Sequence, residues 1–389
     1  MSTLVLPRIL ESGPGSLSRL GSVAGQAGIS RALVITDATM IQLGYVERAL
    51  SALREAGVAA AVFDGTEPEP TETSIIAGLD CLKSGIDGAE FDGLIAVGGG
   101  SAIDSAKALS ILAVHGGRMR DYKVPRIVDE PGLPVIAVPT TAGTGSEATK
   151  VAVITDPETD EKMLCMGLGY MPFGAVLDPE LTYSLPQRVT ADTGIDAITH
   201  AMEAFVSRKA NPFSDQQALA ALRLMGPNIR RVFDDPQNAE AREAMLLGST
   251  LAGIAFSNAS VALVHGMSRP IGAFFHVPHG LSNAMLLPEI TAWSLPSAQS
   301  RYARCARAMG WAADGTSDAE ANDILLEELK MLNADLGVPT PSGFGIEEAR
   351  WRQLRPLMAE QALASGSPGN NPRIPTADEI VELYDRVWA

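Results

Sequence analysis

The chain has 389 residues, 46% of them hydrophobic and 5% aromatic, a composition that indicates a folded protein of two domains. Its formal net charge of -16 disfavours nucleic acid and anionic membranes as main partners. Its three cysteines are too scattered for a disulfide framework or a cysteine zinc cluster, and because we find neither a membrane-length apolar run nor a signal-peptide pattern, we expect a cytoplasmic protein.

Short apolar runs alternate with amphipathic stretches between residues 32 and 177. This alternation predicts a parallel sheet whose strands are joined by crossover helices. The expected strands are residues 32–36, 58–64, 93–97 and 134–139, and a helix is expected over residues 102–114.

Helical periodicity replaces the strand pattern after the Leu185-Pro186 step, for example over residues 197–207, 215–224 and 241–255. We therefore predict an α/β domain over residues 1–186 and an all-helical domain over residues 187–389. Residues 364–375, ASGSPGNNPRIP, are expected to form a surface loop.

A glycine-rich turn follows the strand at residues 93–97 and contains Gly98, Gly99 and Ser101. Backbone N–H groups without side-chain bulk at the start of a helix can bind the diphosphate of a dinucleotide. The alternative is a tight turn in which Ser101 caps the helix with Asp104 as its capping partner.

A second polar loop, TTAGTGS, follows the strand at residues 134–139 and contains Thr140, Thr141 and Thr144. Two such loops at the carboxyl ends of successive strands predict a nucleotide cofactor, because open α/β sheets bind ligands at that edge. Asp37 ends the first strand, where its carboxylate could bind an adenosine ribose and so favour NAD over NADP. Asp37 could instead only start a turn or cap a helix.

Asp196 and His200 lie four residues apart in a helical stretch, on one face of the expected helix. Alone, such a pair could be part of a solvated polar face. However, the chain has only five histidines, and three others, His265, His276 and His279, lie within fifteen residues. Aspartate and histidine ligands suit Fe²⁺ or Zn²⁺, whereas scattered structural histidines are the alternative.

The sequence resembles the iron-containing alcohol dehydrogenases, a family similar in fold to glycerol dehydrogenases and dehydroquinate synthases. The motifs GGGSAIDSAK, PTTAGTGSE, DAITHAMEAF and HGMSRPIGAFFHVPHGLSNA occur in the family's order, and the resemblance covers essentially the whole chain. It implies an N-terminal α/β nucleotide-binding domain, an all-α C-terminal domain, and a cleft for NAD(P) and one divalent metal, with Fe²⁺ favoured and Zn²⁺ possible.

The resemblance also assigns roles to individual residues. The implied metal ligands are Asp196, His200, His265 and His279. The implied cofactor-binding residues are Asp37, Gly98, Gly99, Ser101, Asp104, Thr140, Thr141, Thr144 and Lys162.

The chain departs from the family at Arg269, where many relatives have a second histidine four residues after the third ligand. An arginine stays protonated and cannot act as a base near neutral pH, but it can bind an anionic substrate group. His276 is therefore our hypothetical replacement as proton carrier, with a packing role as the alternative.

These features predict hydride transfer between NAD(H) and a small alcohol or aldehyde, with a hydroxy acid such as 4-hydroxybutyrate or a diol as possible substrates. The alternatives are a lyase similar to dehydroquinate synthase and a non-catalytic nucleotide-binding protein. We also expect a homodimer or larger homo-oligomer without nucleic-acid or membrane partners.

Overall fold

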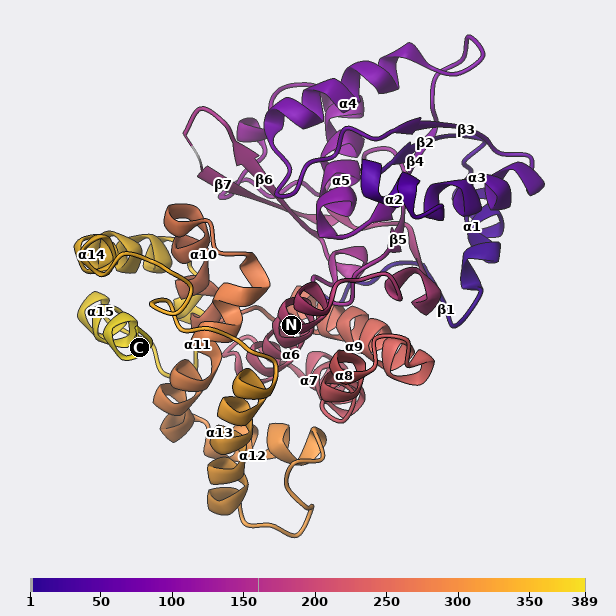
Figure 1. Ribbon diagram of the computed structural model, residues 1–389. Coiled ribbons are helices and arrows are strands. Elements are labelled where there is room, and N and C mark those ends of the chain that lie inside the picture. Colours follow the sequence, from indigo (N-terminus) through magenta and orange to yellow (C-terminus); the bar gives the residue numbers. More distant parts are fainter. Residues whose placement is uncertain (1–2, 160, 389) are drawn as a thin grey trace. The chain divides into compact units, whose positions relative to one another are not determined.

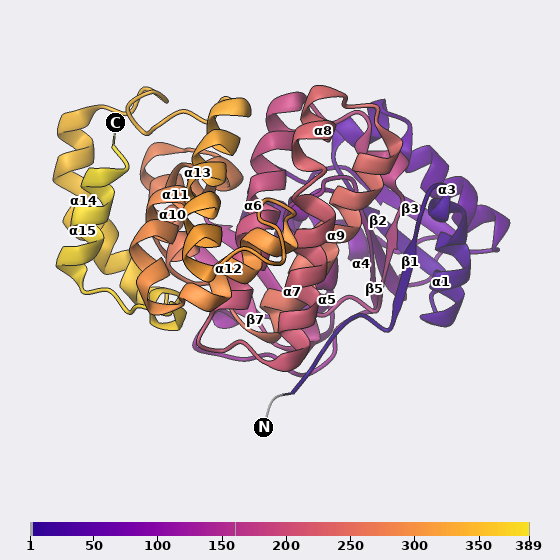
Figure 2. The same ribbon diagram turned by 90° about the horizontal axis from the view of Figure 1, so that it is seen from below.

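The computed structural model describes residues 3–159 and 161–388 (Figures 1 and 2). The chain folds into two compact units, Val5–Ser184 and a second that begins at Leu185. The predicted functional domains, residues 1–186 and 187–389, stay our proposal, and residues 1–2, 160 and 389 within them lie outside the described residues.

The first unit is built on a six-stranded sheet in which every described pairing is parallel, as predicted. Figure 1 shows this sheet in indigo to magenta. In spatial order its strands are β1 (Ile9–Ser12), β8 (Gly174–Leu177), β5 (Val135–Pro139), β4 (Gly93–Gly98), β2 (Arg31–Ile35) and β3 (Ala59–Phe63).

Helices cover the strands of this sheet and connect them. They are α1 (Leu20–Gln26), α2 (Ala38–Gln42), α3 (Tyr45–Glu55), α4 (Glu72–Ser84) and α5 (Gly100–His115). Alternate residues of β2 and β4, such as Val34 and Val97, enter one core with α1 and α3. The residues between them, such as Leu33 and Ala96, are also fully buried, because both faces of a parallel sheet are covered.

A two-stranded antiparallel hairpin, β6 (Val151–Asp156) and β7 (Glu161–Met166), was not predicted. In β6, buried residues alternate with half-buried ones, a pattern typical of a strand with one covered face.

In the main sheet, the two central strands β4 and β5 end where the two predicted cofactor-binding loops begin.

In the described part of the second unit, all regular elements are helical, as predicted. The longer helices are α6 (Gln187–Val206), α7 (Pro212–Met225), α9 (Ala239–Asn258), α10 (Leu263–Phe275), α11 (His279–Ser294), α13 (Asp318–Asp335) and α14 (Glu348–Ala364). The shorter ones are α8 (Ile229–Asp234), α12 (Gln299–Ala308) and α15 (Ala377–Arg386). Figure 2 shows α14 and α15 side by side.

Helix α6 is the central element of this unit, because it packs against α7, α9 and α11. It is buried around its whole circumference from Gly194 to Val206, which is expected of a helix enclosed by others. The solvated polar face considered for Asp196 and His200 is therefore wrong: they are 2% and 5% exposed.

The expectation of a surface loop at residues 364–375 is also wrong in part. Pro368, Asn370 and Asn371 are buried, and Pro368 lies directly against Gly266 of α10. The polar and proline-rich sequence predicted the absence of long helices here, but it could not reveal packing against a distant helix.

Among the described residues, no single helix is long and apolar enough to cross a membrane. Helices α9 and α10 would reach that length and hydropathy only as a pair, which is bent by 104°.

Candidate active site

Helix α6 supplies two of the four predicted metal ligands. Asp196 and His200 lie one turn apart, so their side chains project in the same direction from the helix. The Asp196 Oδ1 and His200 Nε2 atoms are 3.9 Å apart.

The other two predicted ligands come from α10 and α11. His265 lies in the first turn of α10, and His279 is the first residue of α11. Their Nε2 atoms lie 3.4 and 3.9 Å from Asp196 Oδ1. The structure therefore brings together side chains from three helices.

The donor set fits a divalent metal ion. One ligand atom from each of the four residues lies within 4.8 Å of all the others. Four ligands placed tetrahedrally at metal distances of roughly 2.1 Å would be about 3.4 Å apart, close to the spacing observed here. One carboxylate and three imidazoles can hold Fe²⁺ or Zn²⁺, so the geometry alone does not choose between them.

Charge reinforces this arrangement. Burial alone would raise the pKa of Asp196, but the surrounding imidazoles of His200, His279 and His265 hold it well below its usual range. Burial alone would lower the pKa of His265, but the carboxylates of Glu203 and Asp196 raise it to about 9. The site thus stabilises an anionic carboxylate, and a bound cation would take the place of the proton on His265 Nε2.

Asn283 lies at the centre of the same group but was not predicted. Its amide Nδ2 donates to Asp196 Oδ1 at 2.7 Å, and it lies 3.1 Å from His265 Nε2 and 3.3 Å from His279 Nε2. Asn283 is fully buried, and its Oδ1 has no partner among the described residues. The only signal in the sequence is its place one turn after His279, on the same face of α11.

Glu203 also lies on α6, close to the line of Asp196 and His200. Its Oε2 lies 2.6 Å from His265 Nδ1, and Glu203 as a whole is 4% exposed. This contact follows from the meeting of α6 and α10, which the spacing within α6 cannot reveal.

The two candidate catalytic residues lie at different places on α10. His276 ends the helix in a left-handed conformation, with φ 54° and ψ 30°, and is exposed. His276 does not belong to the described four-residue group. Arg269 lies one turn after His265, and its Nη1 donates to Ser367 Oγ at 3.3 Å. Burial lowers the pKa of Arg269, against the opposing charge of Glu203.

In the first unit, the two polar loops approach each other closely. A Cβ atom on Gly99 would lie 3.2 Å from Thr141 Cγ2, and one on Gly100 would lie 2.7 Å from Thr144 Cγ2. A side chain at Gly100 would therefore force Thr144 to move, and one at Gly99 would crowd Thr141. Thr140 Oγ1, at the same edge, is buried without a hydrogen-bond partner among the described residues. A cofactor hydroxyl or amide would satisfy this atom.

Helix α5 begins at Gly100 with Gly99 as its N-cap and no side-chain cap. The alternative in which Ser101 caps this helix is therefore wrong. The first N–H groups of α5 stay available for an anion, as the diphosphate prediction requires.

Asp37 caps a helix and also lies beside the glycine turn. Its Oδ1 accepts hydrogen bonds from the backbone N–H groups of Thr39 and Met40 and so caps α2. Its Oδ2 lies 3.9 Å from the position of a Cβ on Gly98, beside the glycine turn. A carboxylate oxygen at this point could accept a hydrogen bond from a ribose hydroxyl.

Asp104 and Lys107 belong to one buried hydrogen-bond network. Lys107 was not among the predicted site residues. Asp104 accepts hydrogen bonds from Ser146 Oγ at 2.6 Å and from the Val153 N–H at 2.9 Å. Lys107 Nζ donates to Ser146 Oγ and to the Val151 carbonyl. These contacts hold the end of the polar loop after β5, here called the threonine loop, against α5.

Lys162 and Ser101 both contact Glu69. Lys162 Nζ donates to Glu69 Oε1 at 2.6 Å, and the Glu69 N–H donates to Ser101 Oγ at 3.2 Å. Glu69 thus links two predicted cofactor residues from separate segments of the first unit. It stands in an otherwise unremarkable polar stretch, so no sequence signal identified it.

Comparison with known proteins covers both units. Residues 7–179 match the family model for iron-containing alcohol dehydrogenase, and residues 190–388 match the model for the C-terminal part of the Fe-containing alcohol dehydrogenase family. The 1,3-propanediol dehydrogenase of Citrobacter freundii is 36% identical over 391 residues, which cover 100% of this chain and 99% of that protein.

Solved structures agree in fold. A crystal structure of 1,3-propanediol oxidoreductase superposes with a TM-score of 0.94 at 35% identity, with 100% of both chains covered. The sulfoacetaldehyde reductase of Bifidobacterium kashiwanohense, solved in complex with NAD⁺, has a TM-score of 0.89 at 26% identity and covers 100% of this chain and 99% of its own.

Proposed function

This chain belongs to the iron-containing alcohol dehydrogenase family, and we propose on that basis that it transfers a hydride between NAD(H) and a small alcohol or aldehyde at one bound divalent metal. The observation that carries the proposal is the Asp-His-His-His group, which has three buried residues and all four ligand atoms within 4.8 Å of one another. Neither the lyase nor the non-catalytic alternative has comparable support.

Asp196, His200, His265 and His279 would hold the metal, and Fe²⁺ is favoured over Zn²⁺ by the family. When bound, the metal supplies a Lewis acid that lowers the pKa of an alcohol, and the nicotinamide accepts the hydride. The buried position of three of these four ligands excludes bulk water from that side of the site.

The nucleotide would be bound in the first unit by the residues named from the sequence. Gly98, Gly99 and Ser101 would bind the diphosphate at the start of α5, and Thr140, Thr141 and Thr144 the nicotinamide half. Asp104 would act by fixing the threonine loop, and Lys162 together with Glu69 would border the site. Asp37 favours NAD over NADP, because its carboxylate repels a 2'-phosphate.

For the substrate we propose small primary alcohols and diols, with hydroxy acids such as 4-hydroxybutyrate as a second class. Arg269 supports the second class because its guanidinium can bind a carboxylate. The similarity to an enzyme named sulfoacetaldehyde reductase agrees with an anionic substrate. His276 stays our hypothetical proton carrier. We also predict a homodimer or larger homo-oligomer, which light scattering would detect.

The test is an anaerobic assay of chelator-treated protein reloaded with Fe²⁺ or Zn²⁺. We expect NADH formation with NAD⁺ and alcohols only after metal is restored, and weaker activity with NADP⁺. Asp196→Ala and His279→Ala should abolish both metal binding and activity. Full activity in the metal-free protein would contradict the proposal.

The anionic class needs a separate comparison. Arg269→Gln should lower kcat/KM for 4-hydroxybutyrate by at least tenfold and leave a neutral diol nearly unaffected, since a lost charged hydrogen bond costs about 1.5–3 kcal/mol. Equal losses for both substrates, or no loss, would remove the role assigned to Arg269.

A further inference from the structure

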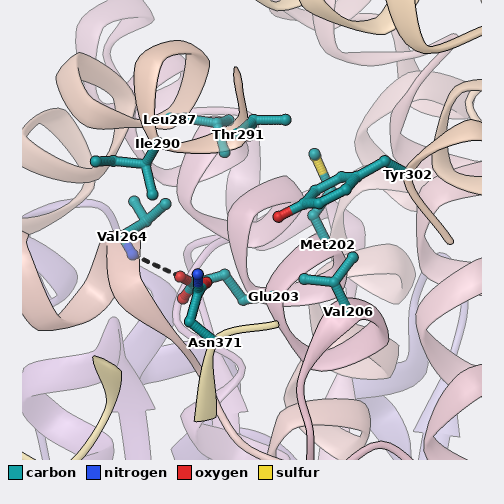
Figure 3. Close-up of a pocket in the computed structure, with 9 residues that line it drawn as sticks. All are labelled: Met202, Glu203, Val206, Val264, Leu287, Ile290, Thr291, Tyr302 and Asn371. Atoms are coloured by element: carbon teal, nitrogen blue, oxygen red, sulfur yellow. Dashed lines mark hydrogen bonds between the residues drawn. The ribbon is translucent and has the colours of Figure 1, made fainter. Parts of the chain in front are cut away.

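Glu203 presents its buried carboxylate to one short stretch of chain at the start of α10. Oε1 accepts a hydrogen bond from the Val264 N–H at 2.6 Å, drawn as the dashed line in Figure 3. Oε2 accepts another from the Ala262 N–H at 2.9 Å and lies 2.6 Å from His265 Nδ1. Helix α10 begins after Ala262, which has no side chain able to cap it. Glu203 therefore caps α10 from a different helix.

The same carboxylate determines which nitrogen of His265 carries the proton. A carboxylate is only an acceptor, so Nδ1 must be the N–H donor in this contact. In the neutral imidazole, Nε2 is then an acceptor, and this atom lies 3.4 Å from Asp196 Oδ1. Glu203 thus directs a lone pair of His265 toward the other predicted ligands.

A small cavity beside Glu203 limits the size of any molecule that can contact the carboxylate from that side. Its volume is about 10 Å³, room for roughly one water molecule. Figure 3 shows its lining, in which the polar residues are Glu203, Thr291, Tyr302 and Asn371. A space of this size cannot admit an alcohol substrate. Glu203 therefore cannot contact an alcohol substrate through this cavity.

We propose that Glu203 is the positioning residue for His265: it fixes the imidazole's tautomer and ring orientation so that Nε2 faces the metal. The inference rests on the proposed metal site and adds to it a residue that links the ligand helix α6 to α10. Partners of this kind typically raise metal affinity by 10–100-fold when they bond a ligand histidine.

The test compares Co²⁺ binding by metal-free wild type, Glu203→Gln and Thr291→Val. Gln keeps the size of Glu203 but replaces one acceptor oxygen with a donor, so it cannot accept all three N–H groups. We expect Co²⁺ affinity to fall 10–100-fold and the visible d–d spectrum of the Co²⁺-saturated variant to change. Thr291→Val alters the lining of the same cavity but keeps the contacts between Glu203 and His265, so it should keep the wild-type affinity and spectrum.

The spectrum at saturating Co²⁺ separates positioning from a general effect on folding. If Glu203 served only to stabilise the fold, the saturated variant would bind more weakly but show the wild-type spectrum, and the proposal would be overturned. A wild-type affinity would overturn it as well. If wild type itself bound no Co²⁺, the metal site of the proposed function would fail instead.

If the Glu203→Gln protein does not fold, Glu203→Asp is used in its place. It keeps the charge and both oxygens but retracts them by one methylene from His265. We expect the same direction of change in affinity and spectrum, to a smaller extent. A folded Glu203→Asp protein identical to wild type in both measurements would contradict the inference.

Discussion

At the scale of single residues, Asn283 lies among three of the four predicted metal ligands. Its amide Nδ2 donates to the Asp196 carboxylate and stands beside two imidazole nitrogens, all of them buried or half-buried. The side chain therefore offsets negative charge inside the ligand group.

Replacing Asn283 with Leu should destabilise the metal-free protein. Leu has a similar size but no donor, so a buried carboxylate loses a hydrogen bond at a cost of about 1–3 kcal/mol. Urea unfolding in the presence of chelator measures the change. Met285→Leu, on the same helix and 7% exposed, is the control and should unfold nearly like wild type. An Asn283→Leu protein as stable as that control would contradict this prediction.

Lys107 is a buried polar residue of the sheet unit that, like Asn283, joins separate segments of the chain. It is fully buried, and burial lowers its pKa to about 8 although the carboxylates of Asp104 and Glu147 oppose the shift. The unfolded lysine keeps its ordinary pKa of 10.5. Between these two values the unfolded chain binds the proton that the folded chain has lost.

Stability should therefore rise with pH across this window in wild type relative to Lys107→Met, by at most about 3 kcal/mol. Below pH 8 the lysine is charged in both states, and its burial penalty is fully present. Urea unfolding of both proteins at a series of pH values from 7 to 11 measures the difference. Parallel pH curves for the two proteins would refute the assignment of a buried, shifted lysine.

At the scale of elements, a short link joins α10 and α11, the helices that carry the predicted ligands His265 and His279. Helix α10 ends at Phe275 because His276 adopts a left-handed conformation, and α11 starts at His279. A left-handed conformation costs a residue with a side chain about 1–2 kcal/mol, whereas Gly adopts it freely and Asn more readily than most.

His276→Gly should accordingly stabilise the protein by about 0.5–1 kcal/mol, measured by thermal unfolding. His276→Asn tests the proton-carrier hypothesis, because Asn suits the same backbone but cannot transfer a proton near neutral pH. We expect His276→Asn to lose the acidic limb of the kcat/KM profile against pH. An unchanged profile would leave His276 as a residue of the turn alone.

The sequence predicted these elements to different degrees. The parallel strands and the long helices follow from local periodicity, so β4, α5 and α9 were predicted to within a few residues. The hairpin β6–β7 was missed because the alternation of its buried residues was read as part of the strand-and-helix series. Glu203, Lys107 and Asn283 were missed for another reason: each acts through contacts with segments far away in the chain, and a pattern within one segment does not contain that information.

At the scale of the whole molecule, the two predicted sites lie in different units. The four predicted metal ligands belong to α6, α10 and α11, and the predicted nucleotide-binding residues belong to the sheet unit. Ligands that bind only the folded state stabilise the parts that hold them.

Adding Zn²⁺ to the metal-free protein should therefore slow amide hydrogen exchange in α6, α10 and α11 but leave β4 and β5 nearly unchanged. Hydrogen exchange followed by mass spectrometry measures both sets in one sample, and the strands are the internal control. NAD⁺ without metal should give the reverse pattern. Protection of the strands by Zn²⁺ alone would argue against ligands confined to the helical unit.

The four predicted metal ligands are unevenly spaced along the chain. Asp196 and His200 share one turn, whereas His265 is separated from them by α7, α8 and α9. A metal bound by all four would act as a removable cross-link that closes this long loop. The entropy of loop closure grows only with the logarithm of loop length. Extra residues in the connection between α8 and α9 would therefore cost the metal site very little entropy of loop closure.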